Sequence, residues 1–138
     1  MESYSNRFGF ENWEVYQLAI DLRADVYKLT EKFPRSEQFG LTNQFNRAAV
    51  SVALNIAEGR GRGTDKDFAR FLHQARGSLL ETVSGCQIAV RLGFLSSSTY
   101  EEISAKAGQI NAKLNTLISA LSDAWGHASC ILRLAFSS

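Results

Sequence analysis

The segment 44–81 constrains the fold most, because two helical patterns of apolar residues flank a glycine-rich turn within it. Apolar residues recur at steps of three and four up to Ile56, and they do so again from Phe68 onwards. Such spacing places apolar side chains on one face of a helix. The turn over 59–63 reads Gly-Arg-Gly-Arg-Gly, and glycine after a helix end adopts a positive φ without steric cost. The segment is therefore predicted to be a helical hairpin.

Two further helical patterns lie outside this hairpin. The first covers about 12–33, with Asn12 as its N-cap, and Pro34 ends it because the residue before a proline is pushed out of the α region. The last begins where Ser98 and Glu101 form a capping box, and it continues to about 121. Four helices with short connectors favour antiparallel neighbours. The predicted fold is all-α, an antiparallel up-down-up-down four-helix bundle.

Length and composition agree with a single globular domain. The 138 residues are 45% hydrophobic and 21% charged. We predict an irregular arm over 1–10, the bundle over 11–121, and a tail over 122–138. The tail interrupts the apolar stripe, so a docked extension of the last helix, an intersubunit contact and a frayed terminus all stay open. The chain shows neither a signal-peptide pattern nor a long uncharged apolar window, and we expect a cytoplasmic protein without a membrane partner.

Two glycines fall inside the third helical pattern, which is predicted to start after the N-cap Thr64 and to end before Gly93. They are Gly77 and Gly85, and each costs up to about 1 kcal/mol relative to alanine. Nothing local favours glycine at either position. We therefore expect both to mark close contacts between helices.

A polar row follows the second helical pattern, again at steps of three and four. Its members are Gln44, Arg47, Ser51, Asn55 and Glu58. A row of this kind either faces water or forms a buried hydrogen-bonded network, and the small residues beside it would let another helix approach closely. Together with Arg76 and Glu81 from the next helix, it is the predicted structural polar network, which holds helix to helix and subunit to subunit.

The turn and the start of the following helix carry the densest cluster of basic residues. These are Arg60, Arg62, Lys66 and Arg70. The net charge of the whole chain is +1, so it argues neither for nor against a polyanionic partner. Arg60 and Arg62 are expected on a flexible turn, and Lys66 and Arg70 share one helical face, an arrangement that suits phosphate oxygens. A solvated face of mixed charge is the alternative. The lack of interleaved aromatic residues argues against stacking on single strands.

Catalysis is not predicted. The histidines are His73 and His127, and the chain contains no zinc-protease motif, phosphate loop or nucleophile elbow. Cys86 and Cys130 lack metal-ligand spacing, and we expect buried apolar residues rather than a disulfide. The sequence therefore indicates no catalytic residue, metal or cofactor.

A pair of carboxylates is the one arrangement that would favour an enzyme. Glu58 and Glu81 could lie near one another on adjacent helices, where such a pair can ligate a metal or do acid–base work. No E-x-x-H motif accompanies them, and Arg47 and Arg76 are their natural charge partners. The acid–base interpretation is therefore the weaker one.

Four blocks of residues occur in a specific order along 8–121. They comprise Trp13 and Ala19; then Phe33, Pro34, Glu37, Phe39, Gly40, Leu41, Thr42 and Gln44; then Arg47, Ala48, Ser51, Asn55, Ile56, Ala57, Glu58, Gly59 and Arg62; and finally Phe71, Leu72, Ala75, Arg76, Gly77, Ser78, Leu79 and Glu81. This order resembles the four-helix-bundle family first noted as products of 23S rRNA intervening sequences. The resemblance implies a homopentamer of antiparallel bundles around a central channel. The family also resembles the accessory protein of diversity-generating retroelements, a similar barrel that binds nucleic acid and a reverse transcriptase.

Two functional hypotheses follow. In the first, a non-catalytic oligomer binds the backbone of structured RNA or DNA through the basic cluster, which a pentamer would repeat on one rim and so strengthen by avidity. In the second, the polar network serves assembly alone, and the protein is a scaffold for another protein. The two can coexist, with the polar network structural and the turn arginines functional, and this combination is the preferred hypothesis.

Overall fold

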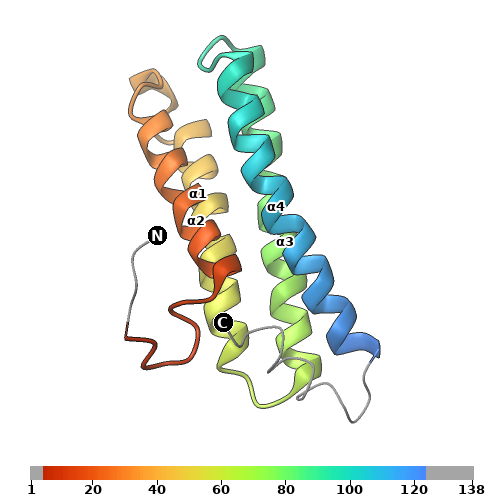
Figure 1. The fold of residues 1–138 in the computed structure, drawn as a ribbon. Coiled ribbons are helices and arrows are strands. Elements are labelled where there is room, and N and C mark those ends of the chain that lie inside the picture. The colour runs from red at the N-terminus through yellow and green to blue at the C-terminus, as the bar shows by residue number, and fades with distance from the viewer. Residues whose placement is uncertain (1–4, 124–138) are drawn as a thin grey trace.

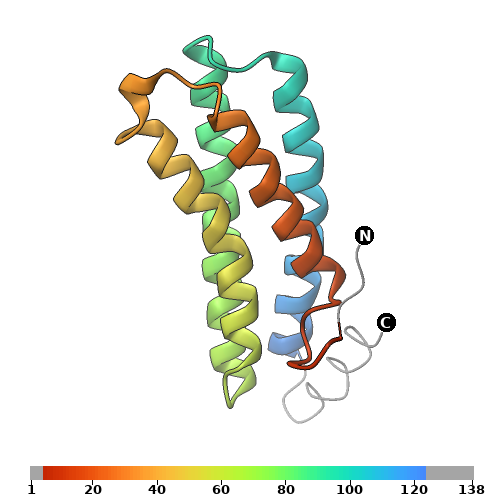
Figure 2. The same cartoon turned by 90° about the vertical axis from the view of Figure 1, so that its left-hand side faces the viewer.

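The computed structural model describes residues 5–123, which form an antiparallel bundle of four α-helices (Figures 1 and 2). The helices are α1 (Glu14–Thr30), α2 (Leu41–Arg60), α3 (Asp65–Arg91) and α4 (Ser97–Asp123), with a short 3-10 turn, η1 (Arg35–Glu37), between α1 and α2. Packing is most extensive between α2 and α3, and α1 against α4 closes the bundle. The predicted all-α, up-down-up-down fold is confirmed.

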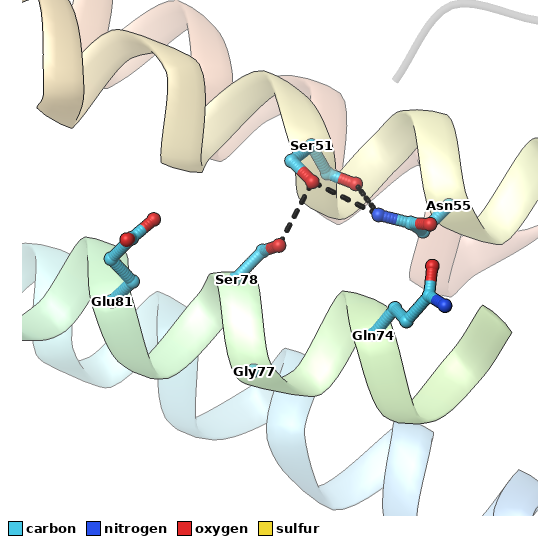
Figure 3. Close-up of a pocket in the computed structure, with 6 residues that line it drawn as sticks. All are labelled: Ser51, Asn55, Gln74, Gly77, Ser78 and Glu81. Atoms are coloured by element: carbon cyan, nitrogen blue, oxygen red, sulfur yellow. Dashed lines mark hydrogen bonds between the residues drawn. The ribbon is translucent and has the colours of Figure 1, made fainter. Parts of the chain in front are cut away.

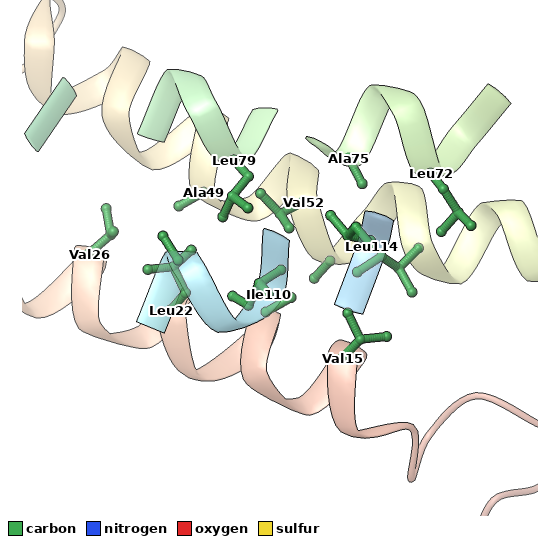
Figure 4. Packing of buried hydrophobic residues seen from close by; sticks show 14 of the residues in the cluster. Val15, Leu22, Val26, Ala49, Val52, Leu72, Ala75, Leu79, Ile110 and Leu114 are labelled. Atoms are coloured by element: carbon green, nitrogen blue, oxygen red, sulfur yellow. The ribbon is translucent and has the colours of Figure 1, made fainter. Parts of the chain in front are cut away.

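The core lies along the bundle axis and is built from the apolar stripes that the sequence predicts (Figure 4). Its largest fully buried aliphatic and aromatic side chains are Leu22 and Val26 from α1, Phe45, Val52 and Ile56 from α2, Leu72 and Leu79 from α3, and Ile110 and Leu114 from α4. Each such side chain stabilises the fold by about 1.5–3 kcal/mol relative to an exposed one. The stripe at steps of three and four therefore identified the inward face of every helix.

Two helix starts differ from the prediction. The N-cap of α1 is Trp13 rather than Asn12, and the side chain of Trp13 makes no capping hydrogen bond. Trp13 is buried and stacks on Phe68 with ring centroids 6.2 Å apart, so tertiary packing sets where α1 begins. At α4, the hydroxyl of Ser96 accepts a hydrogen bond from the backbone N–H of Thr99 at 3.1 Å. The predicted Ser98–Glu101 box is wrong, because both residues already lie inside the helix.

Both ends of α3 are as predicted. The hydroxyl of Thr64 accepts a hydrogen bond from the backbone N–H of Asp67 at 3.1 Å. After the last turn, Gly93 has φ +80°, and the N–H of Phe94 bonds to the carbonyl of Ala89 at 2.8 Å. These bonds satisfy backbone groups that a helix end leaves unpaired.

The turn between α2 and α3 is built differently from the prediction. Gly59 does not stop α2, which continues to Arg60, and Gly61 after it has φ −80°. No positive φ is used here. Instead, a Cβ at Gly59 would lie 2.8 Å from the Cβ of Phe71. Glycine is needed at this position because α3 passes so close to α2.

The two glycines inside α3 differ in how closely another helix approaches them. A Cβ at Gly85 would lie 3.0 Å from the ring of Phe45, so the predicted close contact is confirmed there. At Gly77 no heavy atom of the described residues lies within 4 Å of such a Cβ. The predicted contact at Gly77 is therefore wrong within a single chain.

Some predictions fall outside the described residues. These include most of the predicted tail, with His127 and Cys130. Within residues 5–123, none of the helices has a stretch long and apolar enough to cross a membrane.

The close contact at Gly59 predicts a measurable loss of stability. Gly59→Ala should lower the free energy of unfolding by about 1–2 kcal/mol, because the added methyl group overlaps Phe71. Gly108→Ala on α4 is the matched control, since a Cβ at Gly108 meets nothing within 4 Å. It should raise stability by up to about 1 kcal/mol through helix propensity. Urea denaturation followed by circular dichroism measures both, and an equally stable Gly59→Ala variant would contradict the packing explanation.

Candidate functional site

An open groove lies between α2 and α3 on the outside of the bundle (Figure 3). Its volume is about 390 Å³, and it is lined by Ser51, Asn55, Gln74, Gly77, Ser78 and Glu81. The missing side chain at Gly77 leaves the floor of the groove open. We refer to these six residues as the α2/α3 groove.

Hydrogen bonds within the groove connect the two helices. The hydroxyl of Ser78 donates to the hydroxyl of Ser51 at 2.9 Å. The amide nitrogen of Asn55 donates to both the hydroxyl and the backbone carbonyl of Ser51, each at 2.9 Å. At one end, the side chain of Gln44 donates to a carboxylate oxygen of Glu81 at 3.1 Å. Four members of the predicted polar network are thus bonded in two separate pairs, Gln44 with the exposed Glu81 and Asn55 with the half-buried Ser51.

The other three network residues lie apart from the groove. Arg47 is exposed, and its side chain makes no hydrogen bond or ion pair within residues 5–123. Glu58 binds Arg62 at 2.7 Å, one turn along the chain. Arg76 points toward α4 and donates to the amide oxygen of Asn115 at 2.8 Å. Arg47 and Arg76 therefore do not pair with Glu58 and Glu81 as the sequence suggested.

The carboxylate pair considered for catalysis does not form. Gly59 packs at the level of Phe71, whereas Glu81 is at the level of Gln44. Ten residues of α3 separate Phe71 from Glu81, which is about 15 Å along a helix. Among the described residues, no group of three or more potential metal ligands lies together.

The second candidate site is the end of the bundle where α2 meets α3, and we call Arg60, Arg62, Lys66 and Arg70 the basic end. The guanidinium carbon of Arg62 lies 4.4 Å from the centroid of the Phe71 ring, and that of Arg70 lies 4.6 Å from it. One buried ring therefore holds two guanidinium groups. Lys66 is exposed and forms no ion pair within the described part of the chain.

Arg60 lies on the other side of this end. It is the last residue of α2 rather than part of a flexible turn, and its guanidinium carbon is 5.6 Å from the centroid of the Trp13 ring. Trp13 stands directly before α1. The prediction of a flexible position is wrong because a cation–π contact to another element accompanies the helical backbone.

Carboxylates offset much of the charge at the basic end. Its four cations are accompanied by three carboxylates, those of Glu58, Asp65 and Asp67, so the local charge is +1 (4 − 3). Glu58 binds Arg62 at 2.7 Å, and Asp67 binds Arg70 at 3.2 Å. All four side chains of these two pairs are more than a third exposed, and such exposed pairs contribute only about 0–1 kcal/mol. An incoming phosphate can therefore replace either carboxylate at little cost.

Cys86 is a core residue and not a nucleophile. It is fully buried on α3, and burial raises the pKa of its thiol to about 11. A catalytic cysteine needs the opposite shift, because the thiolate is the reactive form. The predicted role as a buried apolar residue is confirmed for Cys86.

The model of one protein family, described as 23S rRNA-intervening sequence protein, matches residues 11–116. The chain belongs to this family. A search of the curated proteins gives no match. Among solved structures, the chain is similar to a crystal structure of a protein of unknown function from the S23 ribosomal protein family of Bacteroides thetaiotaomicron. The TM-score is 0.70 and the identity 22%, over 75% of this chain and 97% of the other. At this identity, the likeness shows the fold alone.

The residues that carry the family resemblance have two different structural roles. Gly59 and Phe71 pack helix against helix, which explains their residue types within one chain. Ser51, Asn55, Gly77, Ser78 and Glu81 line the α2/α3 groove instead. Sequence analysis missed Gln74, whose side chain points toward Asn55 (Figure 3), because it lies outside both the motif and the polar row. The sequence also did not indicate that the Phe71 ring contacts arginines of the basic end.

The raised pKa of Cys86 predicts that its thiol is protected in the folded protein. In a Cys130→Ser variant, Cys86 should resist iodoacetamide at pH 8, because about one thiol in a thousand is then ionised and the side chain is buried. Unfolding in urea should restore rapid alkylation, which mass spectrometry measures. Alkylation of the native protein at the unfolded rate would contradict the buried position.

Proposed function

We propose that this protein is a non-catalytic module that binds the phosphate backbone of structured RNA or DNA through its basic end. The observation that carries the proposal is the pair of guanidinium groups held against the Phe71 ring. Contact with an aromatic face restricts the rotamers of Arg62 and Arg70 before any ligand arrives. Less side-chain entropy is then lost when a phosphate is bound.

Both arginines keep hydrogen-bond donors for a ligand. A guanidinium has five N–H donors. Arg70 uses its Nε for Asp67, so both of its terminal nitrogens stay available, and Arg62 uses one terminal nitrogen for Glu58. Lys66 adds a cation without an ion-pair partner among residues 5–123. Such a set suits phosphate oxygens and reads no bases.

A local charge of +1 gives one copy only weak attraction for a polyanion. We propose that a homo-oligomer, a pentamer by family resemblance, repeats the basic end along one rim. Several weak contacts on one nucleic acid then act together, which raises the overall affinity without any new contact. Nucleic-acid binding and self-assembly are therefore parts of one proposal.

Charge-removing substitutions test the basic end directly. Affinity for labelled RNA and DNA hairpins should fall steeply between 50 and 200 mM salt, because bound phosphates release counterions. In Arg62→Gln/Arg70→Gln, the slope of log K against log salt should fall by about 2 for each engaged subunit. The double variant Lys32→Gln/Arg35→Gln is the matched control, since it removes two exposed cations from the opposite end of the bundle. Fluorescence anisotropy measures both variants. No binding at 50 mM salt, or equal slopes in the two variants, would overturn the proposal.

A self-assembling scaffold with no nucleic-acid role is the second candidate function, and the open flank of Gly77 favours the assembly on which it depends. Glycine there lowers the helix propensity of α3 and gains no contact within residues 5–123. Leu54 and Leu80 stand one turn from Ser51 and Gly77 and are 60% and 58% exposed. Small residues beside exposed aliphatic ones suit the close approach of a helix. We propose that a helix of a second copy occupies the α2/α3 groove.

Filling the groove from within tests this assembly. Gly77→Leu should fold normally, because the added side chain meets open space, but it should block a helix of another copy. Gly108→Leu, on the outer face of α4, is equally unobstructed and should leave assembly intact. Light scattering after size exclusion should give the protomer mass for Gly77→Leu and a multiple of it for the wild type and the control. A monomeric wild type, or the same mass for both variants, would contradict the groove as an interface. In the latter case, pull-down would test another protein as the occupant.

A further inference from the structure

We infer that the basic end also takes an unpaired nucleobase, which stacks on the ring of Phe8. This inference rests on the proposed function, and it narrows the ligand class. The preferred ligand is then a hairpin loop, a bulge or a strand end rather than a continuous duplex. It also reverses the expectation from the sequence that stacking takes no part in binding.

Phe8 lies in the N-terminal arm, which the fold brings to the basic end. Residues 5–13 run beside the end of the bundle that holds the α2–α3 turn (Figures 1 and 2). A Cβ at Gly9, the residue after Phe8, would lie 3.9 Å from a terminal nitrogen of Arg60. Arg60 in turn packs on Trp13, where the arm joins α1. The arm that carries Phe8 is thus placed beside Arg60, a residue distant from it in sequence.

The arm holds Phe8 in a defined position. The carboxylate of Glu11 accepts hydrogen bonds from the backbone N–H of Phe8 at 2.7 Å and from that of Phe10 at 3.1 Å. Gly9 has φ +87°, a left-handed conformation that favours glycine, and its N–H bonds to the carbonyl of Asn6 at 3.3 Å. The backbone on both sides of Phe8 is therefore fixed by local bonds.

The ring of Phe8 faces solvent while its neighbour does not. Phe8 is 73% exposed, whereas Phe10 is partly buried and packs edge-on against Tyr16 at 4.9 Å. A single exposed aromatic residue is ordinary on a protein surface. Here it stands on a tethered backbone whose next residue, Gly9, lies against Arg60. An aromatic ring near a cation can bind unpaired nucleotides through stacking and phosphate contacts together. A strand whose phosphate contacts Arg60 can place an adjacent base on Phe8.

Three labelled RNAs with related sequences separate the two kinds of contact. They are a stem with an unpaired loop, the same stem as a blunt duplex, and one strand of that stem. The wild type should bind the hairpin and the single strand more tightly than the blunt duplex. Phe8→Ala should weaken binding to the hairpin by about fivefold or more, because each stacked base contributes at least that factor. Its affinity for the blunt duplex and its salt slope should stay unchanged, since no phosphate contact is lost.

Phe39→Ala is the matched control, because Phe39 is 89% exposed and lies between η1 and α2, at the opposite end of the bundle. It should bind all three RNAs like the wild type, and Phe8→Tyr should retain the preference for the hairpin. A 2-aminopurine base in the loop gives a second readout, since stacking quenches its fluorescence, and Phe8→Ala should abolish the quenching.

The outcomes distinguish this inference from the function on which it rests. Equal affinity of the wild type for hairpin and duplex, or a Phe8→Ala variant that binds the hairpin normally, would overturn the stacking site alone. Salt-dependent binding to the duplex would then still support the basic end. Failure of the wild type to bind any of the three RNAs at low salt would overturn the basic end and the stacking site together.

Discussion

The close approach of α2 and α3 determines most of what the molecule presents at its surface. Glycine without a side chain allows it at two levels, where Gly59 meets Phe71 and Gly85 meets Phe45. These contacts fix the register of the hairpin, which sets Ser51 opposite Ser78. The same register opens the α2/α3 groove and places the Phe71 ring between the arginines of the turn and of α3. Both candidate sites therefore depend on one helix–helix distance.

Periodicity in the sequence predicted the helices and the core, because burial of apolar stripes dominates the energetics of a bundle. The start of α3 was predicted from the local side-chain bond at Thr64. At α4 the same kind of bond forms at Ser96, and the prediction placed it at Ser98 because three consecutive serines could supply it. The start of α1 was missed because tertiary packing sets it at Trp13, which stacks on Phe68. Glycine carried the same ambiguity. Gly85 and Gly77 look alike in sequence, since both lie inside α3, yet among the described residues Gly85 is required by the Phe45 side chain and Gly77 faces open space.

The partners of the charged side chains could be predicted only in part, because a long side chain can reach several neighbouring residues. Arg76 bonds to Asn115 on α4, although the sequence offered Glu81 as a partner. Arg60 packs on an aromatic ring that stands 47 residues earlier in the chain (60 − 13). Which neighbour such a side chain meets depends on how the helices are rotated about their axes. That rotation is a property of the whole core and cannot be read from one segment.

Two features of the surface are not explained by contacts within residues 5–123. The flank of Gly77 is empty, and Phe8 is exposed on a backbone that local hydrogen bonds hold in place. The first weakens α3, and the second leaves apolar surface in water. Each would be compensated by a contact that the isolated chain lacks, a helix at the groove and a base at the arm. The weak local charge of the basic end links the two, because one copy with a charge of +1 attracts a polyanion poorly. If copies assembled side by side through the groove, with their bundles parallel to the axis of a ring, every basic end would lie on the same rim. Assembly would then determine the affinity for a polyanion.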